Sequence, residues 1–142
     1  NQLTELPLEL FQLEQLTTLY LNANQLTELP PQVSQLEQLT TLSLSNNQLT
    51  KLPPEIMQLK NLNWLYLHGN QLTSLPPEIV QLKQLRGLEL SGNKIIRLPP
   101  EIAQLPKLEV LWLDNNPLTS PPYELAVQGI EAIRKYFAHN GS

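Results

Sequence analysis

A spacing of 23 residues recurs through this 142-residue chain and constrains its fold more than any other feature. Writing the sequence in rows of 23 aligns leucine in several columns and asparagine in one more. The shared pattern is Leu-x-x-Leu-x-Leu-x-x-Asn-x-Leu, in five consecutive copies without an insertion. A repeat this regular indicates one supersecondary unit that stacks on copies of itself.

The first half of each row alternates leucine with variable residues, which is the period of a half-buried strand. One such strand cannot bury its face alone, whereas stacked copies pair their backbones about 4.8 Å apart and share one core. The sequence therefore predicts a parallel sheet with leucines on its inner face. The central leucines of the predicted strands are Leu19, Leu42, Leu65, Leu88 and Leu111.

An asparagine column follows each predicted strand, where the chain turns away from the sheet. Backbone groups at such a turn would be buried without partners, and an Asn side chain offers both a donor and an acceptor. We therefore expect a structural ladder in which each Asn bridges one coil to the next. Its members are Asn24, Asn47, Asn70, Asn93 and Asn116, and Asn1 precedes them in the same column.

The second half of each row reads Leu-Pro-Pro-x-Ile/Val-x-x-Leu, as in Leu52-Pro53-Pro54 and Leu75-Pro76-Pro77. Proline fixes φ and removes a backbone donor, so these stretches are expected to be irregular or short helical turns. Because this side takes more room than packed strands, the stack should curve. The prediction is an α/β solenoid, a curved right-handed coil with the parallel sheet on its concave face.

The two ends of the chain depart from the repeat. Residues 1–122 form a partial first repeat and five full-phase repeats, and an entry in mid-repeat is expected of a fragment of a longer array. Residues 123–138 are predicted to form an amphipathic helix that caps the core, because Ala126, Ile130, Ile133 and Phe137 recur at helical intervals. Gly129 is a weak point inside it. Residues 139–142 form a tail that a cloning remnant would explain.

Composition argues against several classes of function. Nine Lys and Arg against thirteen Asp and Glu give a net charge of −4, and the basic residues are dispersed, so neither nucleic acid nor a membrane surface is an expected partner. No apolar run approaches the roughly 20 residues that span a bilayer. The chain has no cysteine, whereas secreted repeat proteins often seal their ends with disulfides, so we expect a cytoplasmic location.

No catalytic motif is found either. A nucleophile elbow, a phosphate-binding glycine loop and a metal-ligand cluster are all missing from the sequence. We therefore expect a protein that is not an enzyme and that needs no cofactor or metal.

The repeat matches the leucine-rich pattern, and its consensus sequence is more specific than that general pattern. Asn-Gln-Leu-Thr-x-Leu-Pro-Pro-Glu-Ile-x-Gln-Leu, best seen from Asn70 to Leu82, resembles the 23-residue cytoplasmic subclass of bacterial and archaeal Roco proteins and plant intracellular Ras-group repeat proteins. The segment from Asn116 to Pro122, with the helix after it, resembles the repeat-to-GTPase boundary of Roco proteins. The resemblance implies repeats that bind proteins or regulate an attached GTPase domain.

Strand residues that point away from the leucines line the predicted concave wall. Trp64, Tyr66 and His68 alternate on one strand, roughly 7 Å apart, and Trp112 lies two strands away. Tyr and Trp carry much of the binding energy at interfaces. Two acidic residues on the same wall, Glu89 and Asp114, favour a basic or hydroxyl-rich contact. The alternative is that the aromatics only stabilise the sheet. The predicted partner-binding residues are Tyr20, Trp64, Tyr66, His68, Glu89, Trp112 and Asp114.

Three functions remain open at this point. The first is a recognition module that binds a protein or peptide on the concave face. The second is a regulatory repeat domain that contacts an attached GTPase-like domain through its terminal helix. The third is an engineered or purely structural scaffold, which the near-perfect repeats permit and the irregular concave aromatics disfavour.

Overall fold

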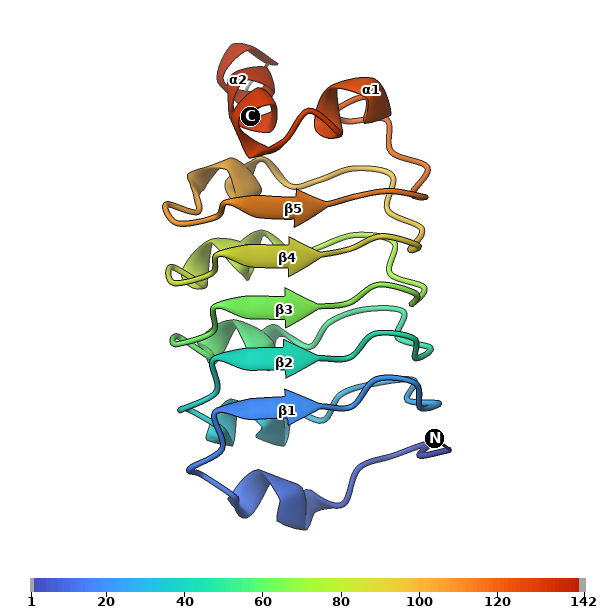
Figure 1. The fold of residues 1–142 in the computed structure, drawn as a ribbon, viewed down its shortest axis with the longest axis vertical. Coiled ribbons are helices and arrows are strands. Elements are labelled where there is room, and N and C mark those ends of the chain that lie inside the picture. The colour runs from blue at the N-terminus through green and yellow to red at the C-terminus, as the bar shows by residue number, and fades with distance from the viewer. Residues whose placement is uncertain (1, 141–142) are drawn as a thin grey trace.

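The computed structural model describes residues 2–140 as a single stack of similar coils (Figure 1). Each repeat contributes one three-residue strand on one side of the stack and one short 3-10 helix on the other. The strands are β1 (Thr18–Tyr20), β2 (Thr41–Ser43), β3 (Trp64–Tyr66), β4 (Gly87–Glu89) and β5 (Val110–Trp112). The 3-10 helices are η1 (Leu8–Gln12), η2 (Pro31–Gln35), η3 (Pro54–Gln58), η4 (Pro77–Gln81) and η5 (Pro100–Gln104).

The sheet confirms the predicted strand pairing. Its order is β1-β2-β3-β4-β5, every pair is parallel, and residues 23 apart face each other. Leu42, Leu65 and Leu88 are fully buried, and Leu111 is 9% exposed. Leu19 is only half-buried, because no coil covers the outer edge of β1 among the described residues.

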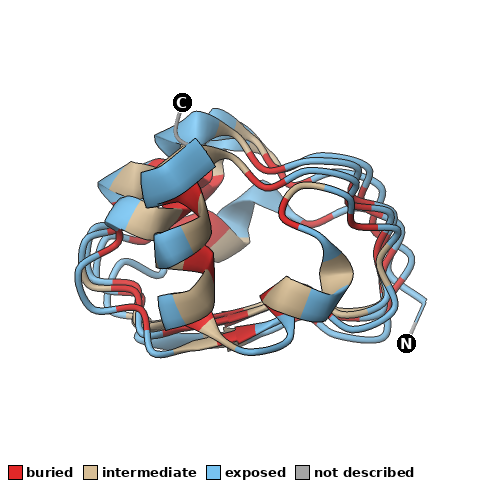
Figure 2. Ribbon diagram, turned by 90° about the horizontal axis from the view of Figure 1, so that it is seen from above, coloured by how far each residue is buried: buried red, intermediate tan, exposed pale blue. Residues whose placement is uncertain are grey.

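The Pro-Pro side of each coil forms the back of the stack. In η3, Pro53 is the N-cap with φ of −68°, and Pro54 is the first helical residue. A proline suits that position because the first N–H groups of a helix have no intrahelical partner. Ile56 and Leu59 from the same segment are fully buried. Seen along the stack, the successive coils overlay one another and enclose the buried positions (Figure 2).

The asparagine side chains form repeated hydrogen bonds between coils. In the third coil, Asn70 Oδ1 accepts from the backbone N–H of Leu49 at 3.0 Å, and Asn70 Nδ2 donates to the carbonyl of Leu44 at 3.0 Å. Both partners belong to the preceding coil, while a third bond, to the carbonyl of Leu67, stays within the coil. The same pattern is found at Asn47, Asn93 and Asn116. Asn1 lies outside the described residues.

The residue before each ladder asparagine adopts a left-handed backbone conformation, which the repeat pattern did not reveal. The φ angle is +70° at Gly69 and at Gly92, where glycine meets no steric penalty. Two further positions carry asparagine, which tolerates this region better than most residues. The remaining member is Ala23, at φ +60°. The column is Ala23, Asn46, Gly69, Gly92 and Asn115.

The C-terminal end differs from its prediction. Instead of one helix over residues 123–138, the chain forms α1 (Tyr123–Ala126) and α2 (Ile130–Asn140). Gly129 separates them at φ +110°, a conformation that no continuous helix contains. The predicted apolar face is nevertheless correct, since Ile130, Ile133 and Phe137 of α2 are buried. The predicted tail is wrong at residues 139 and 140, which belong to α2, and residues 141–142 lie outside the description.

Helix α2 closes the last coil through polar contacts as well as apolar ones. The Arg134 guanidinium donates to the carbonyls of Leu105 at 2.8 Å and of Ala103 and Leu108 at 3.4 Å each. These carbonyls belong to the coil that contains η5 and β5, so Arg134 fastens α2 to the last coil. Among residues 2–140, no helix is long and apolar enough to cross a membrane.

Candidate binding surface

The strands present three columns of residues away from the leucine core, and we call this surface the sheet face. Side chains alternate across a strand, so residues on either side of each buried central leucine point outward. The first column is Thr18, Thr41, Trp64, Gly87 and Val110; the second is Tyr20, Ser43, Tyr66, Glu89 and Trp112; the third is Asn22, Ser45, His68, Ser91 and Asp114.

Trp64 and Tyr66 form a stacked pair on β3. Their ring centroids are 6.3 Å apart and their planes differ by 9°. Trp64 extends over the neighbouring strand, because a Cβ atom at Gly87 would collide with the Cε3 and Cζ3 atoms of its ring. Gly87 therefore lets the indole lie against the backbone of β4. Both aromatic side chains stay half-exposed, so they are packed in place and still accessible.

His68 continues the row of β3 and is held by the coil before it. Its Nδ1 lies 2.9 Å from the hydroxyl of Ser45, which is buried. Ser43, beside Tyr66 in the register, is buried as well. Ser43 and Ser45 are thus covered, whereas the larger Tyr66 and His68 beside them stay partly exposed, and His68 is a positioned polar group at the end of the aromatic row.

Glu89 lies between the aromatic residues of two strands. Its Cα is paired with that of Tyr66 on one side and with that of Trp112 on the other. Glu89 Oε1 accepts a hydrogen bond from the backbone N–H of Ser91 at 2.9 Å, which fixes the carboxylate on its own strand. Trp112 is the more accessible of the two tryptophans, with 41% of its surface exposed.

Two predicted residues lie at the margins of this group. Asp114 is exposed and accepts a hydrogen bond from the Tyr123 hydroxyl at 3.2 Å, so it connects the sheet face to α1. That hydrogen bond, with the nearby negative charge, raises the pKa of the Tyr123 phenol. Tyr20 is 66% exposed on β1, and Ser43 separates it from Tyr66.

The predicted residues therefore divide into a contiguous group and two outliers. We call the contiguous group the aromatic patch, and it consists of Trp64, Tyr66, His68, Glu89 and Trp112. No three His, Asp or Glu residues of the described chain gather in a way that could hold a metal ion. The sequence did not indicate the role of Gly87, although a glycine inside a predicted strand signals a close approach by a neighbour.

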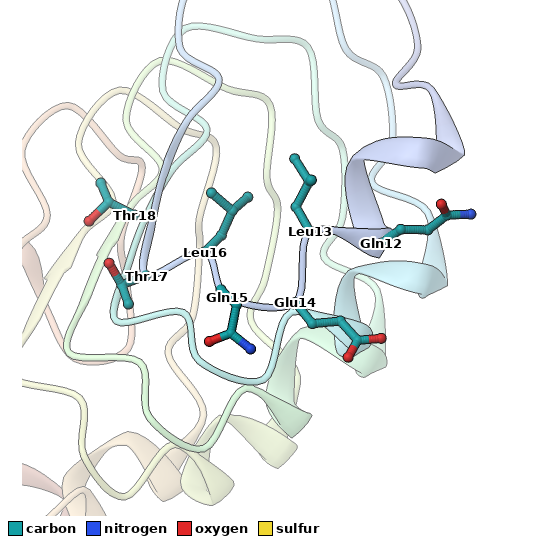
Figure 3. A pocket seen from close by; sticks show the side chains of 7 residues that line it. All are labelled: Gln12, Leu13, Glu14, Gln15, Leu16, Thr17 and Thr18. Carbon is teal, nitrogen blue, oxygen red and sulfur yellow. The ribbon is translucent and has the colours of Figure 1, made fainter.

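A hollow of about 560 Å³ lies outside the aromatic patch, on the free side of the first coil (Figure 3). Residues 12–18 line it, from the end of η1 to the start of β1. Leu13 is 54% exposed there, whereas Leu36, at the same position of the next coil, is fully buried. The hollow is thus the surface that inner coils bury against one another, and it contains no converging charged groups that would define a ligand.

Comparison with known proteins assigns the fold to a family. The profile described as leucine rich repeat matches residues 1–49, 14–72, 37–95 and 60–118, which together span most of the chain. The protein belongs to the leucine-rich-repeat family. A search of curated proteins found no match.

Solved structures of the same family are similar over most of this chain. A leucine-rich-repeat protein of Leptospira interrogans is 50% identical, with a TM-score of 0.84, over 97% of this chain and 33% of its own length. An internalin of Listeria monocytogenes is 27% identical, with a TM-score of 0.74, over 84% of this chain and 34% of its own. The plant peptide hormone receptor RGFR1, solved in complex with RGF2, is 36% identical, with a TM-score of 0.71, over 80% of this chain and 19% of its own length. The chain thus spans about a third or less of the length of these proteins.

Proposed function

We propose that this chain is a protein-interaction module that binds a protein or peptide through the aromatic patch of its sheet face. The observation that carries the proposal is the arrangement of Trp64, Tyr66 and Trp112, which are all partly accessible and lie on strands separated only by β4. Large aromatic side chains held in fixed positions contribute contact area at little entropic cost. The predicted outliers, Tyr20 and Asp114, would contact the margins of the same partner.

The similar receptor that was solved in complex with RGF2 supports a binding role for a fold of this kind. We also propose that the chain is not an enzyme, needs no cofactor and works in the cytoplasm. The first two follow from a sheet face on which no groups converge on a reacting atom, and the third follows from the lack of cysteine.

A second candidate is the regulatory role of a Roco-type repeat domain, in which the terminal helices contact an attached GTPase-like domain. The exposed side chain of Val127, with 50% of its surface accessible between α1 and α2, favours a contact at that end. The 23-residue subclass resemblance, from Asn70 to Leu82, supports the same assignment.

Substitution of one exposed residue at each surface separates the two candidates. Immobilised protein would be used to capture a partner from extract, and the captured partner would then be titrated against purified variants. If the sheet face binds, Trp112→Ala lowers affinity at least tenfold, and Val127→Ser leaves it unchanged. The opposite result would favour the regulatory role. Thermal melting controls for folding, and Trp112 is the better probe because Trp64 also packs on Gly87.

A further inference from the structure

Glu89 is a carboxylate without a counter-ion at the centre of the aromatic patch. It is half-buried, and its Oε1 is engaged by the Ser91 N–H, while its Oε2 has no hydrogen-bond partner in the described part of the chain. No salt bridge among residues 2–140 involves it, since the two that occur join Arg86 to Glu109 and Arg134 to Glu131. One oxygen of Glu89 is therefore positioned and free to accept.

The surroundings of Glu89 carry no positive charge. The three columns of the sheet face contain no Lys or Arg. Arg86 precedes β4, but its guanidinium contacts Glu109 at 3.2 Å. Asp114, at the end of the next strand, adds a second negative charge. The patch thus has a negative potential that the protein itself does not neutralise.

Aromatic rings flank this carboxylate on both sides. Tyr66 and Trp112 are the register neighbours of Glu89, so they lie about 10 Å apart, two strand spacings, with the carboxylate between them. The faces of Tyr and Trp rings attract cations within about 6 Å of the ring centroid. A cation over Glu89 would be within reach of both rings and of the free carboxylate oxygen.

We propose that the aromatic patch recognises a basic side chain of the partner, seated over Glu89 between Tyr66 and Trp112. Arginine fits this arrangement better than lysine, because a planar guanidinium can stack on a ring while its N–H groups donate to a carboxylate. An acidic partner residue would instead face Glu89 and Asp114. This inference rests on the proposed function of the sheet face and specifies the chemistry of what binds there.

Small probes test the cation preference without a known partner. Nα-acetyl-arginine amide and its neutral near-isostere, Nα-acetyl-citrulline amide, would be titrated into the protein while the indole N–H resonances of Trp64 and Trp112 are followed by NMR. We expect saturable shifts of both resonances with the arginine derivative, weakening as salt is added, and at least tenfold weaker binding of the citrulline derivative. Equal binding of the two probes would overturn the proposal. Maltose serves as an uncharged control ligand, and saturable binding of maltose by a patch that shows no preference for the cation would overturn the proposal as well.

A matched pair of charge-neutralising variants locates the preference. Glu89→Gln keeps an oxygen to accept from the Ser91 N–H but removes the charge, and it should reduce the arginine-to-citrulline affinity ratio to about one. Glu78→Gln removes the same charge from the exposed side of η4 and should leave that ratio unchanged. A ratio that persists in Glu89→Gln would refute the role of Glu89.

The outcome also separates this inference from the proposed function. If partner binding withstands Trp112→Ala, then the sheet face is not the binding surface and both proposals fail. If Trp112→Ala abolishes partner binding while Glu89→Gln has no effect on it, the function stands and only the cation site is wrong.

Discussion

Asn70 makes a hydrogen bond between coils that no other group replaces. Its Oδ1 accepts from the backbone N–H of Leu49, a buried residue with no other acceptor for that N–H in the described structure. Asn70→Leu keeps a side chain of similar size and removes this acceptor. A buried N–H left without a partner costs about 1–3 kcal/mol.

The donor side of Asn70 contributes less, because its acceptors are shared. The carbonyl of Leu44 also accepts from Asn47 Nδ2 at 2.9 Å, and that of Leu67 also accepts from Asn93 Nδ2 at 2.9 Å. Each carbonyl therefore loses one of two donors, at about 0.5 kcal/mol each, the low end for a hydrogen bond. We expect Asn70→Leu to lower the free energy of unfolding by about 2–4 kcal/mol in total.

Urea unfolding followed by far-UV circular dichroism and tryptophan fluorescence measures this loss. The matched control is Asn61→Leu, because Asn61 is exposed and its Nδ2 bonds the carbonyl of Glu37 at 3.0 Å. We expect a change below about 0.5 kcal/mol for the control. If Asn70→Leu destabilises no more than Asn61→Leu, the reasoning about the ladder is refuted.

Asn70→Asp adds a pH-dependent arm to the same experiment. The new carboxyl can still accept from Leu49, but when ionised it opposes the carbonyls of Leu44 and Leu67, so its pKa should be raised in the folded state. A raised folded pKa means that the folded protein binds the proton more tightly. The variant should therefore be most stable below the unfolded carboxyl pKa of about 3.9 and lose stability as pH rises through the folded value. A variant whose stability relative to wild type is flat between pH 3 and pH 7 would contradict this.

Four further substitutions test the packing and the backbone. Leu36→Ala should lower the free energy of unfolding by about 2–5 kcal/mol. Leu13→Ala, at the same repeat position on the free side of the first coil, should lower it by less than about 1 kcal/mol. Similar urea midpoints for the two variants would contradict the assignment of buried and free sides. Ala23→Gly should raise the free energy of unfolding by about 0.5–1 kcal/mol, because the φ angle of Ala23 is +60°. A lower free energy of unfolding in urea titrations would show that this backbone conformation is not strained. Gly87→Ala should lower the free energy of unfolding by about 1–3 kcal/mol and change the near-UV circular dichroism of Trp64. An unaltered spectrum would mean that the indole does not lie on Gly87.

The stacked fold could be predicted from the sequence because its determinants repeat at a fixed spacing. Leu42, Leu65 and Leu88 recur every 23 residues, so each strand has a neighbour with the same central leucine to pair with, and no long-range information is needed to choose it. The apolar face of α2 could be predicted for a similar reason, since Ile133 and Phe137 follow the period of a helix. Such patterns are local or periodic, so they can be recognised in the amino-acid sequence alone.

The break at Gly129 was not predicted, because a single glycine inside a helical pattern is compatible with either a weakened helix or two helices. Its φ of +110° depends on how α1 and α2 pack at the end of the stack. The left-handed column was equally hidden at Ala23, where the residue type gives no signal, although glycine at two equivalent positions offered one.

The amino-acid sequence by itself determined which residues lie inside the coils and which lie on the sheet face, because alternation along a strand assigns them. Only the tertiary structure decided how the residues of the sheet face meet. Trp64 lies on Gly87, and His68 contacts Ser45. Each of these contacts joins residues of different coils whose types vary from repeat to repeat, so their geometry depends on the particular neighbours and on the shapes of the side chains that must share the surface.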